Sequence, residues 1–207
     1  MTEPGPRARL LLATTNAGKI REIRQILSGV PVELIALADL SPVEPPEETG
    51  SSFAENARLK ALAYAGATGL PALAEDSGLE IDALDGAPGI HSARLGGDIS
   101  YPAKYELIYR DLRARGASVS RARFVCATAL AIGGVIVVET RGTVEGLIAA
   151  EPKGAGGFGY DPIFFYPPFD RTLAELSADQ KAEVSHRGQA FRQLREWLQQ
   201  DVKLGGS

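Results

Sequence analysis

The feature that most constrains the fold is a pair of long strand-like runs, residues 121–132 and 135–148, separated only by Gly133 and Gly134. A two-glycine connection is typical of a β-hairpin, because the tightest hairpin turns require positive φ angles that glycine adopts without strain. We therefore expect two long antiparallel neighbours, and this hairpin excludes a purely parallel sheet.

The N-terminal part of the chain predicts a strand, a tight loop and a helix. Residues 10–13 form a short apolar run, which is typical of a buried strand. After Asn16, which can serve as an N-cap, apolar residues recur at helical spacing. A later helix begins with the capping-box pattern of Ser52 and Glu55. Further strands are predicted at 32–37 and 163–166 with a short strand at 73–74, helices at 52–67, 101–113 and 187–200, and loops at 42–50, 87–97 and 154–160.

Strands and helices intermix along the chain without an internal repeat or a low-complexity linker. Together with the hairpin, this order predicts an α/β protein with a mixed β-sheet flanked by helices. The length of 207 residues suits one large domain or two lobes that share a core, and we interpret residues 1–207 as a single domain. Residues 205–207 are expected to be flexible.

Charge and residue content disfavour several classes of protein. The net charge is −4 and no basic stripe is present, which argues against nucleic-acid binding. No apolar stretch approaches the roughly 20 residues of a membrane span, and residues 1–9 lack the apolar region of a secretory signal. The single cysteine, Cys126, is expected to be buried, and the lack of a disulfide partner indicates an intracellular protein. With two histidines and one cysteine, a zinc site is disfavoured.

The loop at residues 14–19 is the first segment that can carry chemistry. A loop between a strand and a helix N-terminus offers free backbone N–H groups and the positive end of the helix dipole, and Lys19 adds a full charge. The segment is not a P-loop, because Ala13 and Ile20 stand where that motif needs glycine and serine or threonine. The pattern indicates a phosphate site, although an ordinary capped helix looks the same.

Acidic residues form the second segment. Glu44, Glu47 and Glu48 lie in the proline-rich loop, and Glu75 and Asp76 follow the short strand. Mg²⁺ takes one or two protein carboxylates together with phosphate and water. Carboxylates at the end of a strand are aimed consistently, so they are the better metal candidates, whereas a run of glutamates in a loop is more simply a solvated surface.

The glycine-rich residues 154–162 are the third segment. Glycines let the backbone approach a ligand closely, Phe158 or Tyr160 can stack on a flat base, and Asp161 can accept a hydrogen bond from one. A flexible turn in front of an apolar strand is an equal alternative.

The fourth segment lies before and at the start of the last helix. Lys181 and Arg187 can hold a phosphate or a carbonyl oxygen, and His186 can donate to a purine oxygen. A lone histidine at a helix start is more often a surface residue, and His91 in the loop at 87–97 is expected to be structural.

The order of these segments closely resembles the inosine/xanthosine triphosphate pyrophosphatases, the Ham1-type enzymes. The resemblance implies an elongated α/β fold with a mixed sheet, two lobes with a central cleft, and a homodimer in the cytoplasm. It also implies Mg²⁺-dependent hydrolysis of purine nucleoside triphosphates such as ITP, dITP and XTP to the monophosphate and pyrophosphate. The matching blocks are residues 12–19, 47–57, 74–79, 86–94, 156–162 and 185–188, which span nearly the whole chain.

The resemblance also implies a role for each matching residue. Asp76 would be the proton acceptor and a metal ligand, and Glu47 or Glu48 would supply a further metal ligand. The implied triphosphate loop consists of Thr14, Thr15, Asn16, Ala17, Gly18 and Lys19. The other implied substrate contacts are Ser77, Phe158, Gly159, Tyr160, Asp161, Lys181, His186 and Arg187.

Two positions depart from the family pattern, and two alternative functions stay open. Glu75 stands where the family often has aspartate, and Thr15 stands where it often has glycine. One alternative is a Maf-like pyrophosphatase that acts on modified pyrimidine or methylated nucleotides. The other is a non-catalytic module that senses purine triphosphates, which the acidic residues disfavour because a pure anion binder gains little from negative charge beside phosphate.

Overall fold

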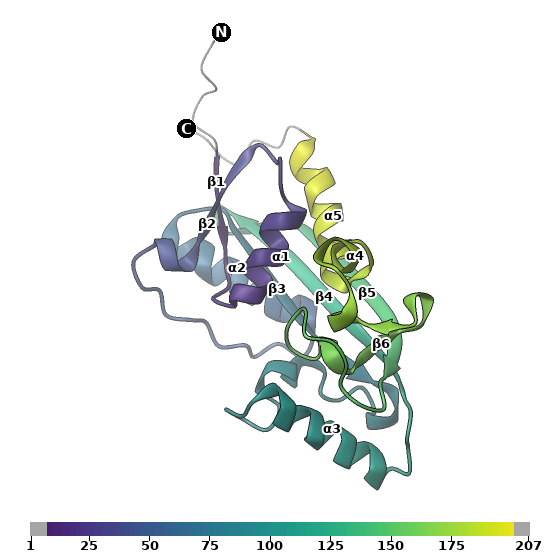
Figure 1. Ribbon diagram of the computed structural model, residues 1–207. Helices are drawn as coiled ribbons and strands as arrows, with labels where there is room; N and C mark the ends of the chain where they lie inside the picture. The colour runs from purple at the N-terminus through teal and green to yellow at the C-terminus, as the bar shows by residue number, and fades with distance from the viewer. Residues whose placement is uncertain (1–7, 201–207) are drawn as a thin grey trace. The chain divides into compact units, whose positions relative to one another are not determined.

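The computed structural model describes residues 8–200, and the two chain ends, for which we expect no secretory signal and a flexible tail, lie outside these residues. Within the described range, seven strands form one sheet in the order β2-β1-β3-β4-β5-β6-β7 (Figure 1). The strands are β1 (Ala8–Leu12), β2 (Val32–Ala36), β3 (Ala72–Ile81), β4 (Arg121–Ile132), β5 (Val135–Ile148), β6 (Phe164–Tyr166) and β7 (Arg171–Thr172). The α-helices are α1 (Ala17–Ile26), α2 (Phe53–Thr68), α3 (Tyr101–Ala114), α4 (Ala178–Val184) and α5 (His186–Gln199).

The sheet is mixed, as the sequence predicts. β1 pairs in parallel with β2 and β3, whereas β6 pairs antiparallel with β5 and β7. β4 and β5 are neighbours in the sheet and are joined by Gly133 and Gly134. The φ angles of these glycines, 56° and 81°, are those of a tight hairpin turn. The hairpin and the α/β class are confirmed.

The chain divides into two compact units. The first unit comprises the residues up to Asp76, Ala127–Arg141 and the residues from Gln189, and the second comprises Ser77–Cys126 and Gly142–Gly188. The boundaries fall inside β3, β4, β5 and α5, so each unit draws on separate stretches of the chain. The interpretation of the whole chain as one domain stays a prediction.

Each unit has its own apolar core. In the first unit, α2 presents Ala57, Ala61 and Ala65, which repeat every fourth residue and therefore share one face of the helix. Their small side chains pack with buried residues of β1 and β3. In the second unit, α3 contributes Ile108 and Leu112 to a core shared with β3, β4, β5 and β6. Cys126 is buried, as expected.

Helix starts follow the predicted caps in part. The Asn16 side chain accepts a hydrogen bond from the Lys19 N–H at 3.1 Å, and α1 begins at the next residue after this cap. Ser52 caps α2 by accepting from the Glu55 N–H at 3.2 Å. The carboxylate of Glu55 binds the backbone N–H and the hydroxyl of Ser51 at 2.7 and 2.8 Å instead of the Ser52 N–H. In a capping box the Glu side chain also accepts from the N–H of the N-cap residue. Here Glu55 accepts one residue earlier, from Ser51.

Strand β3 differs most from the sequence prediction. We expected a short strand that ends before Glu75, but β3 continues to Ile81, so Glu75 and Asp76 lie inside it. Both are buried, with 3% and 7% of their surface exposed. A local pattern assigns adjacent carboxylates to the surface because an unpaired buried charge is costly. The prediction was wrong because lysines from distant segments compensate these charges.

Several smaller elements were also missed, among them α4 and a 3₁₀ helix. The segment before the last helix contains a separate helix, α4, which Ser177 caps by accepting from the Gln180 N–H at 3.2 Å. The predicted loop at 87–97 contains a 3₁₀ helix over Gly89–Arg94. Among residues 8–200, no helix has both the length and the apolar character needed to cross a membrane.

The length of β3 generates a stability prediction. Leu79 is fully buried in the part of β3 that follows the carboxylates. Leu79→Ala should lower the free energy of unfolding by about 2–5 kcal/mol, because it removes buried methyl groups and leaves a cavity. Leu59→Ala on α2, where the side chain is 38% exposed, is the control and should change stability by less than about 0.5 kcal/mol. Urea unfolding measures both; equal effects would contradict the extended strand.

Candidate active site

The loop before α1 has the geometry of an anion site. The Asn16 cap orders the first turn, and the Thr14 hydroxyl accepts from the Asn16 N–H at 3.2 Å. Thr15, Asn16 and Ala17 are exposed, whereas Gly18 is buried. The positive end of the α1 dipole therefore reaches the surface at a loop with a defined conformation, which suits a phosphate group.

Lys19 reaches from this loop to strand β3. Its Nζ lies 3.7 Å from Oε1 of Glu75, whose side chain is 1% exposed. The buried Glu75 carboxylate thus binds the ammonium group of Lys19. The side chain of Lys19 itself is 17% exposed, so part of it stays accessible to a ligand. Glu75, which we expected to be a metal candidate, is thus a partner of the phosphate-loop lysine.

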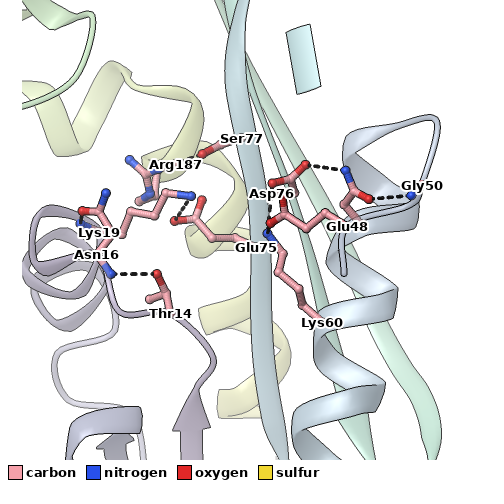
Figure 2. Close-up of polar contacts among 11 residues, drawn as sticks. Thr14, Asn16, Lys19, Glu48, Gly50, Lys60, Glu75, Asp76, Ser77 and Arg187 are labelled. Carbon is pink, nitrogen blue, oxygen red and sulfur yellow. Dashed lines mark hydrogen bonds and ion pairs between the residues drawn. The ribbon is translucent and has the colours of Figure 1, made fainter. Parts of the chain in front are cut away.

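Asp76 belongs to a second set of contacts, which we call the Asp76 group: Glu48, Asn56, Lys60 and Asp76. Lys60 Nζ lies 2.9 Å from Glu48 Oε1 and 2.9 Å from Asp76 Oδ1. Consecutive strand residues point to opposite faces, so Glu75 and Asp76 turn to different sides of β3. Figure 2 shows Lys19 meeting Glu75 on one side of the strand and Lys60 meeting Asp76 on the other.

Lys60 is a residue that the sequence analysis missed. Its side chain is 12% exposed and contacts two carboxylates from different segments. Burial by itself would lower the pKa of Lys60, but the attraction of Asp76 and the contacts with Glu48 outweigh it, and the pKa is raised above its ordinary value. The protonated form of Lys60 is therefore favoured by its carboxylate partners. Its only sequence signal is the four-residue spacing from Asn56, which places both residues on one face of an alanine-rich helix.

The Asp76 group fits a divalent cation. The carboxylates of Glu48 and Asp76 converge on one ammonium group, so both face a position that already favours positive charge. Within residues 8–200, no set of three or more His, Cys, Asp or Glu side chains is arranged to hold a metal. A pair suffices for Mg²⁺, which completes its shell with substrate phosphate and water. Glu47 is exposed whereas Glu48 is half-buried and tied to Asp76 through Lys60, so Glu48 is the better placed of the two.

The second unit contains a buried ion pair that organises the glycine-rich loop. Lys181 Nζ on α4 lies 2.5 Å from Asp161 Oδ2, and the side chains are 7% and 4% exposed. The same Asp161 oxygen accepts from the Phe158 N–H at 2.7 Å. Gly157 has a φ of +67°, and an added Cβ there would collide with the Asp161 carboxylate. Asp161 thus stabilises the conformation of the glycine-rich loop in which it lies.

Phe158 is the aromatic residue of this loop that keeps exposed surface. Its ring is half-buried, and the Lys181 Nζ lies 4.7 Å from its centroid. The Arg187 guanidinium carbon lies 5.4 Å from the same centroid, within cation–π range. Arg187 also donates to the Ser77 hydroxyl at 3.0 Å. Two cations therefore lie within cation–π range of this half-buried ring.

Tyr160 and His186 lie deeper. The Tyr160 hydroxyl donates to the Ser92 carbonyl at 2.7 Å, and its ring packs edge-on against Tyr101. Burial raises the pKa of Tyr160 well above its ordinary value. The His186 ring stacks on Phe124, with centroids 4.8 Å apart. Neither ring has the exposed surface that Phe158 retains. Gly159 is half-buried, and its carbonyl accepts from the Tyr105 hydroxyl.

Several known proteins are similar to this chain. A sequence model of the Ham1 family matches residues 10–197. A dITP/XTP pyrophosphatase of Dictyoglomus thermophilum is 45% identical over 95% of this chain and 97% of its own length, and one of Gloeobacter violaceus is 48% identical over 89% and 91%. Among solved structures, a HAM1 protein from Coxiella burnetii has a TM-score of 0.85 at 42% identity, covering 92% of this chain and 98% of its own. The Ham1 protein of Staphylococcus aureus has a TM-score of 0.82 at 39% identity, covering 94% and 100%.

The buried ion pair generates a prediction. Lys181→Met should lower the free energy of unfolding by about 3–5 kcal/mol, because it leaves the Asp161 carboxylate buried without its cation. Lys153→Met is the control: this side chain is 57% exposed and pairs with exposed Glu151, so its removal should cost less than about 1 kcal/mol. Chemical denaturation compares the two variants, and a stability loss as small for Lys181→Met as for the control would contradict the assigned role.

Proposed function

This chain belongs to the Ham1 family, and on that premise we propose that it hydrolyses non-canonical purine nucleoside triphosphates, among them ITP, dITP and XTP, to the monophosphate and pyrophosphate. The relatives that carry the name dITP/XTP pyrophosphatase match nearly the full length of the chain. The observation that carries the proposal is the convergence of Glu48 and Asp76 on Lys60.

The charges of the Asp76 group explain why it suits a metal–triphosphate complex. Glu48 and Asp76 bring two negative charges and Lys60 brings one positive charge. A divalent cation reverses the net sign of the set, so a polyphosphate is then attracted. Mg²⁺, held by Asp76 with Glu48 or Glu47, would neutralise phosphate charge and lower the pKa of a bound water. Asp76 would accept the proton of the water that attacks the α-phosphorus.

Lys19 and the loop before α1 would hold the phosphate chain. The exposed cap of α1 offers backbone N–H groups, and Lys19 supplies a full charge whose position Glu75 restrains. Lys60 adds a second cation for the phosphates. The proposed triphosphate contacts are Thr14, Thr15, Asn16, Ala17, Gly18, Lys19 and Lys60.

The second unit would recognise the base. Phe158 offers a ring for stacking. To the buried side chains of Arg187 and His186 we assign the donors for the oxygen at purine position 6, where adenine carries an amino group. Guanine shares that oxygen, so its rejection requires a contact at position 2. Lys181 and Asp161 act here by holding the loop that carries Phe158. The remaining proposed contacts are Ser77, Gly159 and Tyr160.

A homodimer and a cytoplasmic location complete the proposal. Both rest on the resemblance to the family, and the single buried Cys126 agrees with an intracellular protein. The proposed partners are the purine nucleotide and a second copy of the chain, without nucleic acid or membrane.

A product assay tests the reaction. Purified protein with Mg²⁺ should release pyrophosphate and the monophosphate from ITP and XTP, little from dGTP or ATP, and nothing when EDTA removes the metal. The readout separates pyrophosphate from orthophosphate. Orthophosphate release would contradict the proposal, turnover of modified pyrimidine nucleotides alone would favour a Maf-like activity, and binding without turnover would favour a sensing module.

The role of Asp76 has its own test. Asp76→Asn keeps the size of the side chain but removes the proton acceptor and one negative charge beside Lys60. The kcat for ITP should fall by about 10²–10⁴-fold, since positioned proton transfer contributes on this scale. Asp98→Asn, at an exposed position, is the control and should keep wild-type kcat. Circular dichroism confirms that both variants fold. Wild-type turnover in Asp76→Asn would overturn the assignment.

A further inference from the structure

Asn56 is a fully buried amide in the first unit. It stands fourth in α2, at 0% exposure, in a helix whose buried face is otherwise mainly alanine and aromatic. Asparagine is a poor helix former, and a buried amide destabilises a fold unless its donors and acceptors are satisfied. The hydrogen-bond partners of Asn56 explain why an amide is tolerated at this buried position.

The two partners of Asn56 come from separate segments. Its Oδ1 accepts from the Gly50 N–H at 2.8 Å, and its Nδ2 donates to Asp76 Oδ2 at 3.2 Å. A backbone N–H can only donate and an ionised carboxylate can only accept, so the amide has one orientation that satisfies both. Figure 2 draws these bonds at Gly50 and Asp76. Among side chains of this size, only an amide performs both functions.

The bond from Asn56 sets the direction of the Asp76 carboxylate. Asn56 holds Oδ2, so Oδ1 turns to Lys60 Nζ at 2.9 Å, which also contacts Glu48. One oxygen of Asp76 therefore bonds with Asn56, and the other faces the cation Lys60. Without the bond to Asn56, the carboxylate could rotate about its last bond and lose this orientation.

The same amide holds the acidic loop. Gly50 follows Glu48 by two residues, and a Cβ added to Gly50 would lie 2.6 Å from Asn56 Oδ1 and 2.7 Å from Glu55 Cβ. Glu55 anchors the next loop residue, Ser51, through its N–H and hydroxyl. The start of α2 therefore binds the loop at two consecutive residues, and the contact leaves no room for a side chain at Gly50.

We propose that Asn56 is a positioning residue of the active site, which fixes the distance and orientation between Asp76 and the loop that carries Glu48. The inference rests on the proposed function, because it assigns Asn56 to the metal-binding pair of that reaction. Asn56 touches neither metal nor substrate in this role. It acts through the carboxylate and the loop.

Asn56→Leu is the sharpest test. It keeps about the size of the side chain and adds no charge beside Asp76, but it removes the donor to Asp76 and the acceptor for the Gly50 N–H. Loss of a hydrogen bond that orients a metal-binding carboxylate typically costs about 10–100-fold in metal affinity or activity. We expect kcat for ITP to fall about 10–100-fold with a smaller change in KM. The affinity for Mn²⁺, used as the probe and measured by electron paramagnetic resonance per folded molecule, should weaken by about tenfold or more.

Thr140→Val is the matched control. Thr140 lies in the same unit on β5, where its hydroxyl bonds with Thr128 and donates to the Ala190 carbonyl. Its loss should lower the melting temperature but leave Mn²⁺ affinity and kcat unchanged. A purely structural role for Asn56 predicts that Asn56→Leu behaves like this control, and that result overturns the proposal.

Gly50→Ala provides an independent test if Asn56→Leu does not fold. It leaves α2 and its amide unchanged but pushes the loop away from Asn56. We expect weaker Mn²⁺ binding and reduced kcat, and wild-type values for both would overturn the proposal. If wild-type protein hydrolyses no purine triphosphate, the proposed function fails, while the Mn²⁺ comparison among the variants still decides the role of Asn56.

Discussion

The arrangement of the first unit depends on two carboxylates inside strand β3. Glu75 and Asp76 are adjacent, buried and turned to opposite sides of the strand. A buried carboxylate without a partner costs several kcal/mol, about the range of a protein's whole stability, so β3 requires compensating cations. Lys19 from α1 and Lys60 from α2 supply them. The packing of both helices against the sheet therefore also brings the two lysines to the two carboxylates.

In the second unit, a buried ion pair binds the backbone of an aromatic residue. Asp161 and Lys181 form a buried pair, and the carboxylate also binds the backbone of Phe158. The glycine at 157 allows this close approach. A loop that is rich in glycine would otherwise sample many conformations. The ion pair and the hydrogen bonds of the Tyr105 and Tyr160 hydroxyls restrict it.

Local structure was largely predictable because its causes are local. The hairpin at Gly133 and Gly134 follows from the turn geometry of glycine, and the start of α1 follows from the Asn16 cap. The capping pair Ser52 and Glu55 was predicted correctly in position, although Glu55 binds Ser51 on its return side. The order of the motifs, from residues 12–19 to 185–188, was enough to indicate the family, since each block is a contiguous stretch of chain.

The sequence by itself determined the α/β class, the hairpin and the family. Only the tertiary structure decided that β3 runs through Asp76 and that Lys60 and Asn56 join this carboxylate. It also decided that Glu48, in contrast to the exposed Glu47, is tied to Asp76 through Lys60. Propensity and periodicity describe neighbours in the chain, whereas the burial of a charge depends on partners tens of residues away. Lys60 is 16 positions from Asp76 and Asn56 is 20, so their role exists only after the helix has packed against the strand.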